Sequence, residues 1–122
     1  MDELIARIVS NVGIERPVAE RAVGIILDFL ATEGPADKVQ TLLARLPGAA
    51  EAAAAAHAEG GGGLFGGMGG IMGVGSRLMS AGLGMGEIQG VTHEIIGYAR
   101  EKAGNEDLDA IVEAIPGLSQ YI

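Results

Sequence analysis

The chain has 122 residues, 16 acidic against 8 basic side chains and a formal net charge of −8, and it contains no cysteine. This length allows one domain with a real core. The negative charge repels phosphate backbones, so we expect no nucleic-acid partner, and the lack of cysteine excludes disulfides, zinc–thiolate sites and thiol catalysis.

The amino-terminal residues MDELIARIVS include two acids and lack the basic region of a secretory signal peptide. We therefore predict a cytoplasmic protein.

The first 48 residues predict three helices. One apolar stripe at helical spacing consists of Leu4, Ile5, Ile8, Val9 and Val12. A second helix begins at Pro17, a residue that suits a first helical position, and ends near Gly34. A third follows Pro35 and stops at Pro47 and Gly48.

Residues 49–59, AAEAAAAAHAE, have high helix propensity but little to bury, so we expect a thin helix or a connector. Helical patterning returns at Glu87, and Asn105 is a suitable N-cap for a last helix. No stretch alternates as a strand, which predicts an all-α fold. We expect two amphipathic helical hairpins in one folded unit. The first, together with the alanine-rich helix, occupies residues 1–59, and a Gly/Met-rich segment, residues 60–86, joins it to the second, residues 87–122.

The two hairpins also resemble each other. Shifting the chain by 69 residues places Ile26 on Ile95, Phe29 on Tyr98, and the sequence LPG that ends the third helix on the IPG at residues 115–117. Few of the paired residues are identical, so two explanations stay open. One is an internal duplication, and the other is chance similarity between two amphipathic hairpins.

Two segments, AVGIILDFLATEGPADKVQTLLARLPGA and GMGEIQGVTHEIIGYAREKAGNEDLDAIVEAIPGLSQYI, carry a resemblance to known proteins. The chain is similar to a group of small bacterial proteins known only as a domain of unknown function, with a glycine-rich middle and a carboxy-terminal IPGL. The resemblance implies a bacterial origin and a helical fold, and it supplies no catalytic residues.

Motifs that carry chemistry are incomplete. The sequence GIMGVGSR approaches a phosphate-binding loop but lacks its lysine, and a run so rich in glycine produces such matches by accident. His93 and Glu94 begin a zinc motif whose second histidine is Gly97. We predict no catalytic residue, no cofactor and no metal, and hence no enzyme.

The Gly/Met-rich segment is the most unusual part of the sequence, because ten of the sixteen residues from 60 to 75 are glycine and the other six are apolar. A flexible linker would have polar companions, and the uncharged run is too short to span a membrane. We favour a third interpretation, in which the segment is ordered and its methionines fill gaps in a close contact.

We therefore predict a small helical interaction or structural protein that associates with itself through this segment. The alternative is a protein that binds an apolar ligand or a membrane surface through the same side chains. The candidate contact residues are Leu64, Phe65, Met68, Ile71, Met72, Leu78, Met79 and Met85.

Overall fold

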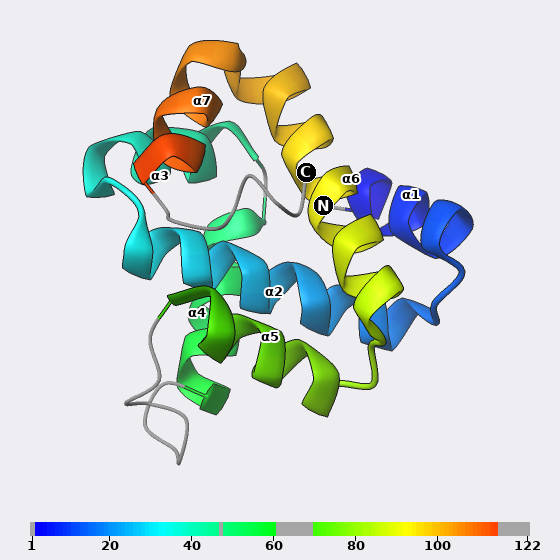
Figure 1. Ribbon diagram of the computed structural model, residues 1–122. Helices are drawn as coiled ribbons and strands as arrows, with labels where there is room; N and C mark the ends of the chain where they lie inside the picture. Colours follow the sequence, from blue (N-terminus) through cyan, green and yellow to red (C-terminus); the bar gives the residue numbers. More distant parts are fainter. Residues whose placement is uncertain (1, 47, 61–69, 115–122) are drawn as a thin grey trace.

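A computed structural model describes residues 2–46, 48–60 and 70–114, and Figure 1 shows their arrangement. The described residues form seven helices and no strand, so the prediction of an all-α fold is confirmed. The helices are α1 (Asp2–Val12), α2 (Arg16–Glu33), α3 (Ala36–Arg45), α4 (Ala49–Gly60), α5 (Gly70–Ser80), α6 (Met85–Ala103) and α7 (Asn105–Ala114). None of these helices is long and apolar enough to cross a membrane.

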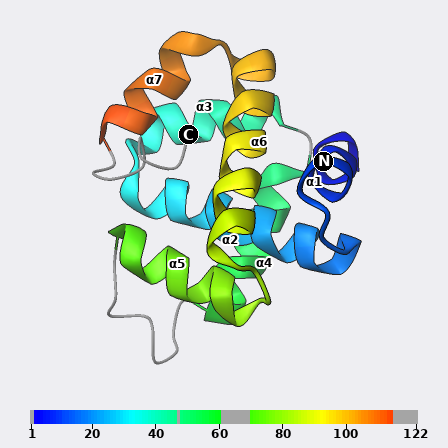
Figure 2. The same cartoon turned by 45° about the vertical axis from the view of Figure 1, so that its right-hand side comes forward.

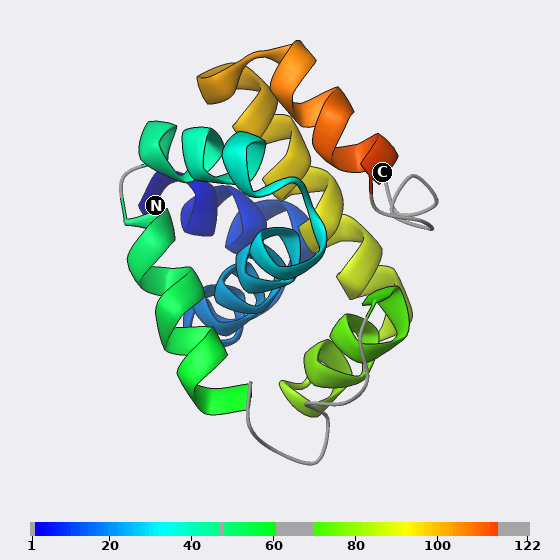
Figure 3. The same ribbon diagram turned by 90° about the vertical axis from the view of Figure 1, so that its left-hand side faces the viewer.

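Helix α2 is the centre of the fold. Every residue from Ala22 to Leu30 is buried, and α2 contacts α1, α3, α4, α5 and α6. Figure 3 shows α2 nearly end-on, with α4 on one side and α5 and α6 on the other. A helix that is apolar on all sides is stable in water only when other helices surround it.

The alanine-rich helix α4 packs closely against α2. Ala49, Ala53 and Ala56 are buried, and a Cβ atom on Gly24 of α2 would lie only 2.8 Å from the backbone oxygen of Ala52. The expectation that residues 49–59 have little to bury was therefore wrong. Short side chains allow two backbones to approach closely, so α4 covers α2 without large apolar groups.

The helix bounds repeat along the chain. Adding 69 to both bounds of α3 gives those of α7, and adding it to the first residue of α2 gives the first residue of α6. The same shift relates α1 to α5 within one residue. Gly13 and Gly82, which follow α1 and α5, are also related in this way, and their φ angles are 86° and 108°.

Contacts between the two halves follow a twofold pattern. Helix α1 packs on α6, and its counterpart α5 packs on α2. Helices α3 and α7 lie side by side, at the top of Figures 1 and 2. These relations favour duplication of a three-helix unit over chance similarity. The sequence pattern indicated a two-helix hairpin for the second unit, and not three helices, because α5 lies in the glycine-rich region. Helix α4 has no counterpart among the described residues.

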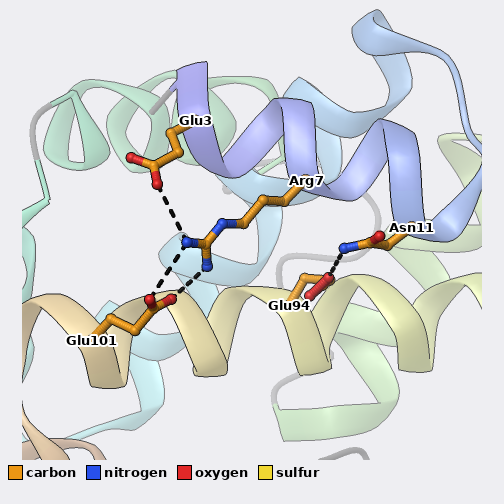
Figure 4. Close-up of polar contacts among 5 residues, drawn as sticks. All are labelled: Glu3, Arg7, Asn11, Glu94 and Glu101. Atoms are coloured by element: carbon orange, nitrogen blue, oxygen red, sulfur yellow. Dashed lines mark hydrogen bonds and ion pairs between the residues drawn. The ribbon is translucent and has the colours of Figure 1, made fainter.

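Polar contacts also join α1 to α6 (Figure 4). The guanidinium of Arg7 contacts the carboxylate of Glu101 and lies 3.2 Å from that of Glu3. It also lies 5.3 Å from the ring centroid of Tyr98, within the range of a cation–π contact. The hydrogen bond from Arg7 lowers the pKa of Glu101 below its ordinary value of 4.5, and the same bond raises the pKa of Arg7.

We expect opposite effects of alanine at two glycines. Gly24→Ala places a methyl group against the α4 backbone and should lower the free energy of unfolding by about 1–3 kcal/mol. Gly97→Ala lies in an exposed part of α6 with no atom within 4 Å of the added group, and should raise it by about 0.5–1 kcal/mol. Urea unfolding measures both, and equal effects would contradict the close α2–α4 contact.

We expect Glu101 to make stability depend on pH. Because its pKa is lower in the folded chain, its contribution is present above about pH 4.5 and is lost as the pH falls through the folded value. Glu101→Gln should therefore be less stable than wild type near neutral pH, and this difference should shrink on acidification. Urea unfolding along a pH series measures this, with Glu113→Gln, an exposed carboxyl on α7, as control. A difference that is constant with pH would contradict the prediction.

Candidate interaction surface

The structure divides the eight candidate contact residues into three groups. Leu64, Phe65 and Met68 lie outside the described residues, and Ile71 and Met72 belong to the first turn of α5. Leu78 is 1% exposed and is a core residue, so it does not reach the surface of the folded chain. Met79 and Met85 are 50% and 53% exposed.

Helix α5 forms although three of its first six residues are glycine, which opposes an isolated helix. Tertiary packing supplies the missing stability, because Val74 and Leu78 are buried and α5 contacts both α2 and α6. The glycines therefore mark a helix that depends on its neighbours.

The turn from α5 to α6 is held by hydrogen bonds at both ends. Gly82 ends α5 with a φ of 108°, its N–H donates to the oxygen of Met79 at 3.0 Å, and the N–H of Leu83 donates to the oxygen of Leu78 at 3.2 Å. This pattern is a Schellman motif, with Leu78 and Leu83 both buried. At the start of α6, the N–H of Gly84 donates to Glu87 Oε1 at 2.8 Å.

We give the name methionine patch to the exposed residues around this turn: Met79, Ser80, Gly82, Gly84 and Met85. Its two methionines are the large apolar side chains that the described part of the chain exposes. No charged residue occurs between positions 78 and 86. The patch therefore exposes two apolar side chains on a fixed turn, with the carboxylate of Glu87 at its edge, in a chain whose net charge is −8.

The first half of the molecule shows that the fold does not require these methionines. The counterparts of Met79 and Met85 under the 69-residue shift are Ser10 and Arg16, which are exposed. Arg16 contacts Asp2 at 3.1 Å and Glu20 at 3.4 Å. Polar residues thus occupy the related places on either side of the turn that contains Gly13, and the methionines need another explanation than folding.

A buried polar cluster lies beneath α5. Asp28, in the middle of α2, is 6% exposed, and its Oδ2 accepts a hydrogen bond from Arg77 Nη1 at 2.9 Å. Its Oδ1 lies 3.2 Å from His57 Nδ1 on α4. Arg77 Nη2 also donates to the backbone oxygen of Ala56 at 2.8 Å. The cluster therefore joins α2 to both α4 and α5.

This cluster, too, departs from the repeat. The counterparts of Asp28 and Arg77 are Gly97 and Ile8, so the equivalent contact between α6 and α1 has no ion pair. A buried ion pair contributes little net stability compared with apolar residues, but it penalises arrangements in which one partner is unpaired. We infer that the pair fixes the position of α5, and with it the methionine patch.

Asp28 and Arg77 are not among the candidate residues predicted from the sequence. One signal was present, because Asp28 interrupts the apolar run GIILDFLA of the second helix. Arg77 is the single charged residue between positions 60 and 86. Sequence spacing does not show that these two residues, 49 positions apart, meet.

The carboxylate of Asp28 contacts both the imidazole of His57 and the guanidinium of Arg77. The guanidinium also binds the backbone oxygen of Ala56, and its charge neutralises that of the carboxylate. His57 is largely exposed, and His93 lies exposed on α6. Within residues 2–46, 48–60 and 70–114, no group of three or more metal-binding side chains is close enough to hold an ion.

Comparison of the chain with models of protein families, with curated proteins and with solved structures found no match.

We expect a strong coupling between Asp28 and Arg77. Asp28→Ala or Arg77→Ile leaves one buried charged group without its main partner and should lower the free energy of unfolding by about 3 kcal/mol. The double variant removes both charges and should be less destabilised than the sum of the two single variants. Urea unfolding of all four proteins gives the coupling, and additive effects would contradict an ion pair that acts as a unit.

Proposed function

We propose that the protein is a small helical interaction protein that associates with a second copy of itself through the methionine patch. One observation carries the proposal. Met79 and Met85 are half exposed at positions where the other half of the molecule has Ser10 and Arg16.

The charge of the chain supports an apolar, uncharged contact. Copies that each carry −8 repel one another, and this repulsion is smallest where the approaching surfaces have no acidic residue. Residues 60–86 contain no acidic side chain, whereas residues 1–59 and 87–122 carry net charges of −4 and −5.

The rigid turn also favours binding. Methionine adapts its shape to a partner, whereas the backbone beneath the patch is held by the Schellman motif and by the buried Leu78 and Leu83. A contact on a preformed backbone loses less conformational entropy than one on a flexible segment.

The energy of the patch sets the expected strength of association. Full burial of a methionine is worth about 1.5–3 kcal/mol, and each of these side chains is already half buried. The two methionines together therefore supply roughly 1.5–3 kcal/mol, less than the cost of association, which is about 4 kcal/mol or more. A stable complex needs further buried surface around the patch.

We expect Met79→Ser/Met85→Arg, which installs the counterparts from the first half, to abolish self-association and to keep the helical fold. Light scattering after size exclusion, over a range of concentrations, should give a mass above 12.4 kDa for wild type and 12.4 kDa for the variant. Circular dichroism checks that the variant is folded. Met79→Leu/Met85→Leu is the matched control, since it keeps both side chains apolar and should still associate.

A wild-type mass of 12.4 kDa at every concentration, or an unchanged mass in the Ser/Arg variant, would contradict the proposal. A monomer that sediments with zwitterionic phospholipid vesicles, and loses this property in the Ser/Arg variant, would favour a membrane surface as the partner instead.

A further inference from the structure

The methionine patch is the place where solvent meets sulfur in the described part of the chain. The sequence has no cysteine, so methionine is its one sulfur-containing residue type. The side chains of Met79 and Met85 are 50% and 53% exposed. Small oxidants in solvent therefore reach these two side chains directly.

The buried core is built from other residue types wherever the structure describes its side chains. It consists of Leu, Ile, Val and Ala together with Phe29 and Tyr98. Beneath the patch, the buried Leu78 and Leu83 hold the turn and have no sulfur to oxidise. A chemical change at the two exposed methionines is thus confined to the surface and leaves the packing under it intact.

The repeat shows that polar groups at these two places do not oppose folding. Ser10 and Arg16 occupy the related positions in the first half of the molecule and are exposed. Oxidation converts the apolar methionine side chain into a polar sulfoxide. An oxidised patch therefore resembles the corresponding surface of the first half in polarity, and we expect oxidation to change the surface and not the fold.

Hydrogen peroxide is the simplest oxidant for this reaction. A lone pair of the methionine sulfur attacks one peroxide oxygen, so that an S–O bond forms and the O–O bond breaks. The sulfur loses two electrons to the peroxide, and the proton of the transferred oxygen leaves with the released hydroxide as water. Because peroxide is neutral, the net charge of −8 does not repel it.

We propose that oxidation of Met79 and Met85 to sulfoxides switches off self-association through the methionine patch, and that reduction restores it. This inference rests on the proposed self-association and specifies its regulation. A sulfoxide oxygen accepts hydrogen bonds from water, and an apolar contact would remove these bonds at a cost. Loss of the apolar burial of both methionines corresponds to a dissociation constant that is about 10- to 100-fold higher.

Reversal requires a second reaction that is known for this product. Methionine sulfoxide reductases remove the oxygen as water, and each acts on one of the two sulfoxide epimers. The electrons come from two thiols, which become a disulfide. Since the chain has no cysteine, these thiols belong to another molecule. The exposed position of both side chains gives such an enzyme access to them.

Trypsin separates the methionines for the test. Cleavage on the carboxyl side of arginine releases residues 78–100, which contain both methionines of the patch and no other. The remaining three methionines lie in residues 1–7 and 46–77. After peroxide treatment of the full chain, mass spectrometry should find two added oxygen atoms in residues 78–100. Light scattering after size exclusion should show the higher dissociation constant, and circular dichroism should show unchanged helix content.

Met79→Leu/Met85→Leu is the matched control, because it keeps an apolar patch and retains the other three methionines. Its association should not respond to peroxide. Treatment of the oxidised wild type with reductases for both epimers and dithiothreitol should remove the oxygen atoms from residues 78–100. Association should then return to that of the untreated protein.

The outcomes separate this inference from the proposed function. Association that persists after full oxidation of residues 78–100, a control variant that dissociates in peroxide, or a loss of helix content on oxidation would overturn the inference. Reduction that removes the oxygen atoms without restoring association would overturn it as well. In each case association through the patch stands if Met79→Ser/Met85→Arg is a monomer. If the untreated wild type is a monomer, both proposals are wrong.

Discussion

The close contact between α2 and α4 is the constraint on which the rest of the structure depends. Helix α2 has no polar face from Ala22 to Leu30, so it must be surrounded, and Gly24 lets α4 approach until a Cβ would clash with the Ala52 oxygen. The same short side chains that permit this approach leave a groove between α1, α2 and α4 at the surface. Core and groove therefore have one physical origin, the small residues of α4.

The repeated helix pattern separates what folding requires from what it does not. Positions buried in both halves, such as Phe29 and Tyr98, serve the shared core. Positions that differ in chemistry, such as Asp28 against Gly97, are places where one half has a property that the shared helix pattern does not need. Positions related by the 69-residue shift can thus be compared within one chain, and this comparison helps to interpret the methionines and the buried ion pair.

Helical periodicity predicted the fold class and most helices because amphipathic stripes such as that of α1 are local signals. It missed α5 as a separate helix, since its glycines oppose helix formation and only contacts with α2 and α6 stabilise it. It misjudged α4 because alanine carries no visible apolar stripe. Among the candidate contact residues, the local pattern did not distinguish the buried Leu78 from the exposed Met79. Their difference in burial depends on how α5 is rotated against the core.

The difference between the two halves bears on how copies would associate. A chain with two identical halves has the same surface on both sides of its twofold axis. Once Arg16 and Met85 occupy related places, the molecule has two unlike ends, one charged beside a groove of small residues and one apolar on a rigid turn. Divergence between the two halves is thus sufficient to give the molecule one apolar surface where exact repetition would give two.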